Sequence, residues 1–163
     1  MTDNKSPSKY LYYDTLEWGC RTLAARIQLS DLVFDCILAV TGNGLFVAHL
    51  LSQFLNIPEV WTIGLEVEGD ERPYIHVPNP MIFTGRTVLI VDFLAKTGRT
   101  LQQVEKLFSV SRPKVSTASA VFYWCRSSYV PDMSPNFYVE ELQEEVYLIF
   151  PWTKRLERKE NNV

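Results

Sequence analysis

Two short segments of the chain have the composition of phosphate-binding turns. The first consists of Thr41, Gly42, Asn43 and Gly44, and the second consists of Thr97, Gly98, Arg99 and Thr100. Glycine lets the backbone come close to an anion, and the amide groups at a helix N-terminus favour negative charge. The two threonine hydroxyls would add donors in the second segment. Both segments therefore predict contacts with phosphate groups.

Asp92 ends a run of apolar residues shortly before the second turn. A carboxylate at the end of a strand could accept hydrogen bonds from sugar hydroxyls or hold a hydrated Mg²⁺ ion. Helix capping is the structural alternative for Asp92 alone. The second turn is not a Walker A loop, because the order Gly-Lys-Ser/Thr is absent. The acid and the turn together favour a sugar phosphate as the ligand.

The first turn allows two other interpretations. A dinucleotide-binding turn would have a glycine or alanine at a set spacing, but Ala48 falls one residue too late for that pattern. Glu66 does lie about 20 residues further on, where a ribose-binding acid would stand. The turn could also simply close a crossover between two strands.

Apolar periodicity predicts the elements that position these turns. Strand-like runs cover residues 34–40, 60–65, 87–91, 115–123, 138–139 and 146–150, and helical spacing covers residues 16–27, 47–55 and 101–108. Asp14 and Glu17 have the spacing of a capping box at the start of the first helix. The order strand, turn, helix, strand is typical of a right-handed parallel crossover. We therefore expect an α/β fold with a mainly parallel sheet and with both turns at the carboxyl ends of strands, where such sheets bind ligands.

The length and composition limit what the chain can be. It has 163 residues, of which 47% are hydrophobic and 21% charged, so we expect a single domain over residues 1–163. No apolar run approaches the ~20 residues of a membrane helix, and the net charge of −3 does not favour nucleic acid as a partner. Cys20, Cys36 and Cys125 are too scattered to predict a disulfide framework or a zinc site. We expect a cytoplasmic protein.

Three segments fall outside the regular pattern. Residues 1–9 are polar, which predicts a flexible leader rather than a secretory signal. Residues 66–85 contain three prolines, two glycines and a cluster of charge, which predicts a hairpin or a mobile flap. Residues 154–163 form a charged tail that we expect to be solvated.

Several runs resemble the type I phosphoribosyltransferases. VLIVDFLAKTGRT, residues 88–100, resembles the diphosphate-sugar signature of that family, and ILAVTGNGLFVAHLL, residues 37–51, is similar to its pyrophosphate loop. Near the C-terminus, residues 131–132, 138–141 and 147–152 resemble the xanthine, guanine and hypoxanthine branch, in which an aromatic residue stacks on the purine just before Pro-Trp. The resemblance covers most of the chain. It implies a single-domain phosphoribosyltransferase-like fold with a small hood from the C-terminal part and a flexible flap.

The resemblance also implies a reaction and a set of roles. A nitrogen of a 6-oxopurine would displace pyrophosphate from phosphoribosyl diphosphate and give a nucleoside monophosphate, with Mg²⁺ as cofactor. Residues 97–100 would hold the 5′-phosphate, and residues 41–44 would face the pyrophosphate. Asp92 would contact the ribose hydroxyls directly or through the metal. Tyr147 would stack on the base, and the backbone of Leu148 would read its edge.

Some positions depart from the family pattern. Phe93 stands in place of the second acid of the signature, and Lys96 stands where the family often carries an acid near the purine N7. With Asp92, Lys96 is a candidate catalytic residue. The arginine that is usual in the first loop aligns with Gly42 or Asn43.

The position that recognises the base also differs. The lysine that reads the purine 6-oxo group in this branch aligns with Trp124, or with Arg126 if the loop is shifted by two residues. Trp124 is therefore a candidate base-binding residue.

Three functional hypotheses follow. The first is a purine phosphoribosyltransferase, with phosphoribosyl diphosphate and a purine base or nucleoside monophosphate as partners. The second is a catalytically degenerate relative that binds a nucleotide as a sensor or regulator, because Lys96 and Arg99 make the second loop more cationic. The third is an unrelated α/β nucleotide binder that uses residues 42–48. Apolar residues at 10–13, at Trp61 and at 121–124 would suit a dimer interface, so we expect a homodimer or a higher homo-oligomer.

Overall fold

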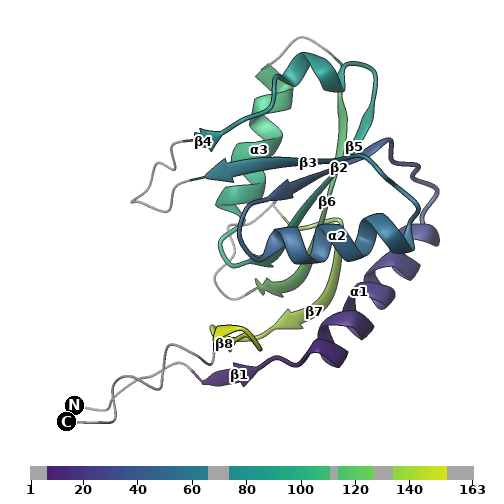
Figure 1. Cartoon of the computed structure of the whole chain (residues 1–163). Coiled ribbons are helices and arrows are strands. Elements are labelled where there is room, and N and C mark those ends of the chain that lie inside the picture. Colours follow the sequence, from purple (N-terminus) through teal and green to yellow (C-terminus); the bar gives the residue numbers. More distant parts are fainter. Residues whose placement is uncertain (1–6, 66–73, 111–113, 127–133, 154–163) are drawn as a thin grey trace.

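The structure is a computed structural model that describes residues 7–65, 74–110, 114–126 and 134–153 (Figure 1). Its helices are α1 (Tyr13–Gln28), α2 (Gly44–Phe54) and α3 (Arg99–Val110), and a short 3₁₀ turn, η1, spans Pro80–Phe83. Its strands are β1 (Ser8–Tyr10), β2 (Cys36–Val40), β3 (Val60–Leu65), β4 (Tyr74–His76), β5 (Thr87–Ala95), β6 (Ser116–Cys125), β7 (Phe137–Leu142) and β8 (Tyr147–Ile149). Helices and strands alternate through most of the chain, which confirms the predicted α/β class.

Six strands form the central sheet, in the order β4-β3-β2-β5-β6-β7. Five neighbouring strands of this sheet are parallel: β3, β2, β5, β6 and β7. β4 runs antiparallel to β3 at one edge. β2 and β5 lie at the centre. Cys36–Val40 is buried along its whole length, as is typical of a parallel strand that is covered on both faces.

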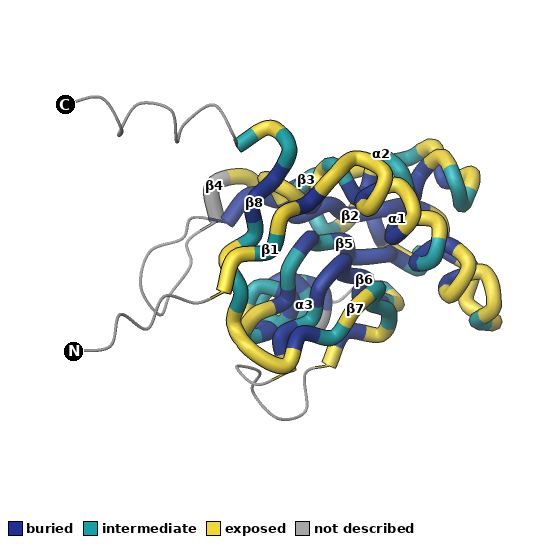
Figure 2. The backbone as a smooth tube through the Cα atoms, turned by 90° about the horizontal axis from the view of Figure 1, so that it is seen from below, coloured by how far each residue is buried: buried dark blue, intermediate teal, exposed yellow. Residues whose placement is uncertain are grey.

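Helices cover both faces of the sheet. Alternate residues of β2 point to opposite faces, so Ile37 and Ala39 pack with α1 and α2, whereas Leu38 and Val40 pack with α3. Figure 2 shows the middle of the sheet, around β2 and β5, in the colour of buried residues. Each face of the sheet therefore has its own apolar core.

A two-stranded unit stands beside the central sheet. β1 pairs in parallel with β8, with Ser8 opposite Tyr147 and Tyr10 opposite Ile149. Figure 1 shows this pair next to β7. We call β1 together with residues 143–150 the hood. The expected hood from the C-terminal part is present, and it includes a strand from the N-terminal segment.

The N-terminal segment differs from its prediction in two ways. Residues 8 and 9 lie in β1 and not in a flexible leader, because pairing with β8 satisfies their backbone groups. The predicted capping box is absent, since α1 begins at Tyr13 and the cap residue Tyr12 makes no side-chain cap hydrogen bond. Asp14 lies inside the first turn, where a negative charge still favours the positive end of the helix. Residues 1–6 lie outside the described residues.

The segment 66–85 contributes partly to the body of the domain. β3 and β4 pair at Gly64 and His76, which gives the base of the expected hairpin. η1 follows, and Phe83 is fully buried against the core on the α3 face. The flap prediction for residues 66–73 and the tail prediction for residues 154–163 concern parts of the chain outside the described residues.

The predicted dimer patches differ in exposure. Residues 121–123 are buried inside the sheet, so this part of the prediction is wrong. Tyr10, Tyr12 and Tyr13 are more than half exposed. A homo-oligomer thus stays a prediction. Within the described ranges, none of the helices is long and apolar enough to cross a membrane.

Gly19 marks the closest approach of α1 to the sheet. A Cβ atom at Gly19 would lie 2.2 Å from Cζ of Phe122, whose ring stacks on Phe93 with 5.0 Å between ring centroids. Because the Phe122 ring is held in that stack, we expect Gly19→Ala to lower the free energy of unfolding by about 1–3 kcal/mol, although alanine favours helix. Urea denaturation measures the change. Adding Phe122→Leu should restore part of the loss, and a more stable Gly19→Ala protein would contradict the close packing.

An ion pair connects the segment before β3 with the segment before β5. Both terminal nitrogens of Arg86, just before β5, donate to the carboxylate of Glu59, just before β3, at 2.7 Å. Trp61 Nε1 donates to the same carboxylate at 2.6 Å. Hydrogen bonds from Arg86 and then Trp61 lower the pKa of Glu59 to about 2.

The low pKa of Glu59 predicts a pH-dependent stability. The unfolded chain binds a proton at Glu59 more readily, so the contribution of Glu59 is complete above about pH 4.5 and is lost as the pH falls towards 2. We expect Glu59→Gln to lower the urea midpoint at neutral pH, with a difference from wild type that shrinks over this range. Glu17→Gln, which removes an exposed ion pair with Arg21, should have little effect. A difference that stays constant with pH would contradict the role of Glu59.

Candidate functional site

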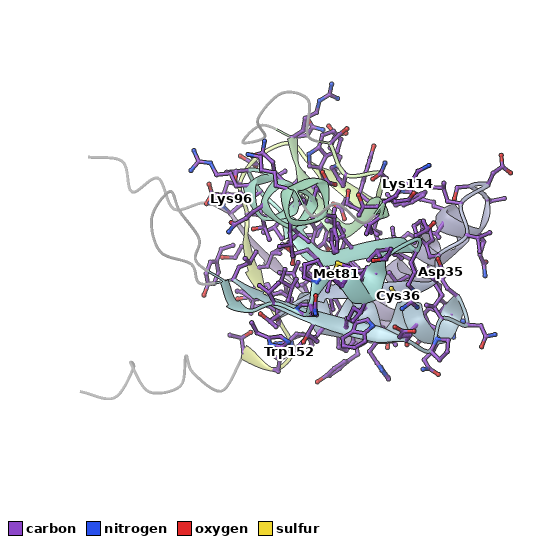
Figure 3. All side chains as sticks on the ribbon, turned by 90° about the horizontal axis from the view of Figure 1, so that it is seen from above. Asp35, Cys36, Met81, Lys96, Lys114 and Trp152 are labelled. Carbon is purple, nitrogen blue, oxygen red and sulfur yellow. The ribbon has the colours of Figure 1, made fainter. Side chains whose placement is uncertain are left out.

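The two glycine-containing turns lie side by side at the carboxyl edge of the sheet. β2 and β5 are adjacent and parallel, with Ala39 opposite Val91, so the turns that follow them leave the sheet at the same edge. Figure 3 shows Lys96 and Trp152 towards this end of the molecule and Asp35, just before β2, towards the other. The sequence-based expectation that the turns meet at the carboxyl ends of strands is therefore confirmed.

Gly44, the first residue of α2, is the point of contact between the turns. A Cβ atom at Gly44 would lie 3.2 Å from both Asp92 Cα and the carbonyl oxygen of Val91, and 3.3 Å from Asp92 Oδ1. Two of these three neighbours are backbone atoms of a central strand, which cannot easily move. Glycine at position 44 therefore allows the N-terminus of α2 to approach the carboxylate of Asp92.

A cavity of about 50 Å³ opens in the second turn, where there is room for a small group such as one phosphate. It is lined by Asp92, Leu94, Ala95, Lys96, Thr97, Gly98, Thr100 and Leu101. Gly98 has a φ of +75°, in the left-handed region that favours glycine, and α3 begins at the next residue. The first amide groups of an α-helix have no partner within the helix. The cavity thus combines a helix N-terminus, two hydroxyls and a lysine, all of which favour an anion.

A larger cavity of about 300 Å³ lies between the first turn, β5 and the hood. It is lined by Asn43, Asp92, Phe93, Leu94, Val146, Tyr147, Leu148 and Phe150. Its volume is within the range of small-molecule sites, and most of its walls are apolar or aromatic. Such walls suit a flat aromatic ligand.

Asp92 and Leu94 line both cavities, so the two cavities are direct neighbours. Asp92 is half-buried, and its Oδ1 accepts a hydrogen bond from the backbone nitrogen of Phe93 at 2.6 Å. β5 continues past Asp92 to Ala95, and α3 begins only at Arg99. Asp92 is therefore too far along the chain from Arg99 to cap α3.

Phe93 points to the opposite face of the sheet from Asp92, as neighbouring residues of a strand do. Its ring stacks on Phe122 and meets the edge of Phe150 at a centroid distance of 4.9 Å. Only 2% of Phe93 is exposed. A carboxylate in this position would be buried among aromatic rings, which is unfavourable. The local packing therefore suits phenylalanine and not the second acid of the family signature.

The structure brings most of the predicted site residues together. Asn43, Tyr147 and Leu148 line the larger cavity, residues 96–98 and Thr100 line the smaller one, and Asp92 lines both. Tyr147 is 60% exposed, so its ring is accessible for stacking.

Other residues of the two turns do not line these two cavities. Thr41 and Gly42 line neither of them. The backbone nitrogen of Thr41 donates to the carbonyl oxygen of Ile63 at 2.9 Å, which connects the first turn to β3. Arg99 is exposed on the first turn of α3. Gly44 acts through its contact with Asp92, as described above.

Trp124 is not brought to either cavity, contrary to the sequence-based expectation. Its ring packs against Tyr138 at a centroid distance of 5.1 Å, next to the core on the α3 face. Arg126, the alternative position, is exposed, and its Nη1 lies 3.5 Å from the carboxylate of Glu141. Neither residue lines either of the two cavities described above.

Several residues of the larger cavity were not predicted from the sequence. Leu94, Val146 and Phe150 line this cavity. The aromatic run before Pro151 was the one sequence pattern that pointed to this region. Trp152 stacks on Phe150 at 5.0 Å and contacts Phe46 of α2 at 5.4 Å. These contacts hold the hood against the helices and place Tyr147 at the cavity.

The buried thiols do not contribute nucleophiles. Burial raises the pKa of Cys20 to about 12 and that of Cys36 to about 11, so both stay protonated at neutral pH. They lie in the two apolar cores, away from the cavities.

Asp92 is the acidic residue among those that line the cavities. The described ranges contain no group of three or more residues of metal-ligand type. Mg²⁺ is often held by one or two carboxylates together with the phosphate oxygens of a substrate. A single carboxylate at the junction of the cavities fits this kind of site and does not suit a metal held by protein groups alone.

A comparison with protein families agrees with this geometry. Residues 11–153 match the phosphoribosyl transferase domain. The chain belongs to the phosphoribosyltransferase family. Among curated proteins, the xanthine-guanine phosphoribosyltransferase of Gluconobacter oxydans is 28% identical over 164 residues, which cover 93% of this chain and 90% of that protein.

Solved structures support the same fold. The xanthine-guanine-hypoxanthine phosphoribosyltransferase of Helicobacter pylori has a TM-score of 0.76 at 18% identity, covering 96% of this chain and 99% of that chain. A protein from Neisseria gonorrhoeae, solved with bound ppGpp, has a TM-score of 0.79 at 20% identity, covering 95% and 96%. The type I phosphoribosyltransferase-like fold is therefore confirmed.

The contact at Gly44 gives a test of how the two turns are held. We expect Gly44→Ala to lower the free energy of unfolding by about 1–3 kcal/mol, because its Cβ would press on the backbone of β5. Urea denaturation measures the loss. Leu45→Ala, at an exposed position on the same turn of α2, should change stability by less than about 0.5 kcal/mol. Equal stability of Gly44→Ala and wild type would show that the close approach is not required.

Proposed function

We propose that this chain is a purine phosphoribosyltransferase that transfers the phosphoribosyl group from phosphoribosyl diphosphate to a 6-oxopurine. The observation that carries the proposal is the pair of neighbouring cavities, of about 50 and 300 Å³, which share Asp92 and Leu94. A ribose that carries a 5′-phosphate and a base has the same two-part form. The curated relatives named xanthine-guanine phosphoribosyltransferase favour a purine as the acceptor.

The second turn would hold the 5′-phosphate. In the smaller cavity the amide groups at the start of α3 and the hydroxyls of Thr97 and Thr100 would donate hydrogen bonds, and Lys96 would supply positive charge. The structure thus favours a role for Lys96 at the phosphate rather than at the base.

The first turn and the hood would hold the rest of the ligand. Asn43 at the larger cavity and the glycines around it would face the pyrophosphate. Tyr147 would stack on the purine, and the backbone of Leu148 would read its edge. Asp92, at the junction, would accept hydrogen bonds from the ribose hydroxyls.

In the proposed reaction a purine nitrogen forms a bond to C1′ of the ribose while the bond from C1′ to the pyrophosphate oxygen breaks, and the purine gives up its imidazole proton to water. Positive charge develops on the ribose ring, and the pyrophosphate leaves with the electron pair. Fixed dipoles at the sites of developing charge are the main source of such catalysis. In this proposal the carboxylate of Asp92 would lie near the ribose, and the turn at residues 41–44 would lie beside the leaving group.

Mg²⁺ would be held by Asp92 together with oxygen atoms of the bound diphosphate. When bound, the metal would neutralise charge on the leaving pyrophosphate. A side chain at position 44 would press on the carboxylate of Asp92, so glycine there supports this role.

A second function, nucleotide binding without turnover, is favoured by two of the same residues. Phe93 leaves the site with one carboxylate instead of two, and Lys96 adds a cation to the smaller cavity. Both changes favour a bound phosphate over catalysis. A structural relative from N. gonorrhoeae was solved with bound ppGpp.

Two assays on the purified protein separate these functions. The first measures pyrophosphate release from phosphoribosyl diphosphate with guanine, hypoxanthine or xanthine, with and without Mg²⁺. The second measures the thermal shift that GMP, IMP, XMP or AMP causes, again with and without Mg²⁺. We expect Mg²⁺-dependent pyrophosphate release with at least one 6-oxopurine and stabilisation by the matching monophosphate.

Asp92→Asn and Thr97→Ala should both abolish binding of the monophosphate, because they remove the carboxylate at the junction and a donor of the phosphate cavity. Arg126→Ala, on an exposed residue away from both cavities, should bind as wild type. Tight monophosphate binding without pyrophosphate release would favour the second function. Unchanged affinity in both Asp92→Asn and Thr97→Ala would place the ligand elsewhere and refute the site.

A further inference from the structure

An ion pair connects the phosphate cavity with the hood. Lys96 Nζ, in the turn after β5, pairs with the carboxylate of Glu145, which lies just before β8. Lys96 lines the smaller cavity, and the two residues that follow Glu145, Val146 and Tyr147, line the larger one. The pair thus spans the edge of the site between the two cavities.

Lys96 and Glu145 are exposed enough for Lys96 to leave Glu145 and pair with another anion. The side chains of Lys96 and Glu145 are 45% and 50% exposed. Exposed ion pairs of this kind are weak, whereas a phosphate group offers several charged oxygens to an ammonium group. Since Lys96 already lies on the wall of the smaller cavity, a phosphate there competes with Glu145 for the same ammonium group.

The rest of the hood is held by bonds that a ligand would not touch. The backbone nitrogen of Tyr147 donates to Pro7 at 2.8 Å, and that of Leu11 donates to Ile149 at 2.8 Å. Lys9 of β1 pairs with Glu140 of β7 at 2.5 Å, away from both cavities. Val146 is held by packing against the apolar core. Loss of the Lys96–Glu145 pair would therefore free residues 143–145 while β1 and β8 stay paired.

We propose that Lys96 exchanges Glu145 for a bound phosphate, so that occupancy of the smaller cavity releases the hood edge beside the larger one. The proposal rests on the proposed function only in that the smaller cavity takes a phosphate group. It makes Glu145 an internal competitor of the ligand and couples the two cavities through one lysine. No chemical step is required, so the coupling applies to an active enzyme and to a nucleotide sensor alike.

Binding of inorganic phosphate and of GMP to the full chain tests the exchange by calorimetry. Glu145→Gln should tighten the Kd of both ligands by up to about fivefold, the value of one exposed ion pair. Lys96→Met should weaken both. Adding Glu145→Gln to Lys96→Met should give no gain, because the residue for which the anions compete is absent.

Two matched variants separate the exchange from general charge effects. Glu144→Gln removes the same charge from the neighbouring exposed residue, and Glu140→Gln removes the ion pair with Lys9. Neither should change the Kd as Glu145→Gln does. An equal gain in Glu144→Gln, or a gain from Glu145→Gln that persists without Lys96, would overturn the exchange.

NMR relaxation of the backbone amides measures the release of the hood edge directly, as a change in order parameters. In wild type, inorganic phosphate should lower the order parameters of residues 143–145, and in Glu145→Gln these order parameters should be low already without ligand. Unchanged or higher order parameters on phosphate binding would overturn the coupling while leaving the phosphate site intact. If wild type binds neither inorganic phosphate nor GMP, the proposed function fails together with the coupling.

Discussion

The parallel pairing of β2 with β5 brings two distant turns to one place, and the rest of the site depends on it. Each strand ends in a turn that leads into a helix, so adjacent strands give adjacent helix N-termini. The absence of a side chain at Gly44 then lets α2 come within van der Waals distance of Asp92. With a larger residue there, the carboxylate would be covered and the junction of the cavities would be lost.

The aromatic packing below the site determines how much charge the site can hold. Phe93 joins a stack with Phe122 and Phe150 that links β5, β6 and the hood. This stack extends the apolar core to the floor of the larger cavity. The stack supports the hood. It also places the Phe93 ring where the family signature has a second carboxylate. Among the described residues that line the two cavities, the charged groups are the carboxylate of Asp92 and the ammonium group of Lys96. These two groups therefore bear most directly on the two proposed functions, transfer and simple binding.

The hood shows how the ends of the described chain complete the site. β1 and β8 are separated by most of the sequence, yet they pair in parallel and support Tyr147. Trp152 holds the same unit against Phe46 of α2. Because the larger cavity lies between the hood and the carboxyl edge of the sheet, its shape is set by these long-range contacts.

Local patterns in the sequence determined the strand at residues 60–65, the two turns and the acid at Asp92, because apolar periodicity and turn composition depend on neighbouring residues. The tertiary structure alone decided that residues 8–10 form a strand, that Trp124 packs away from the cavities and that Lys96 pairs with Glu145. Each of these outcomes depends on a partner far along the chain. Backbone groups and charges take the partners that folding brings near, and no short pattern records which partner that is.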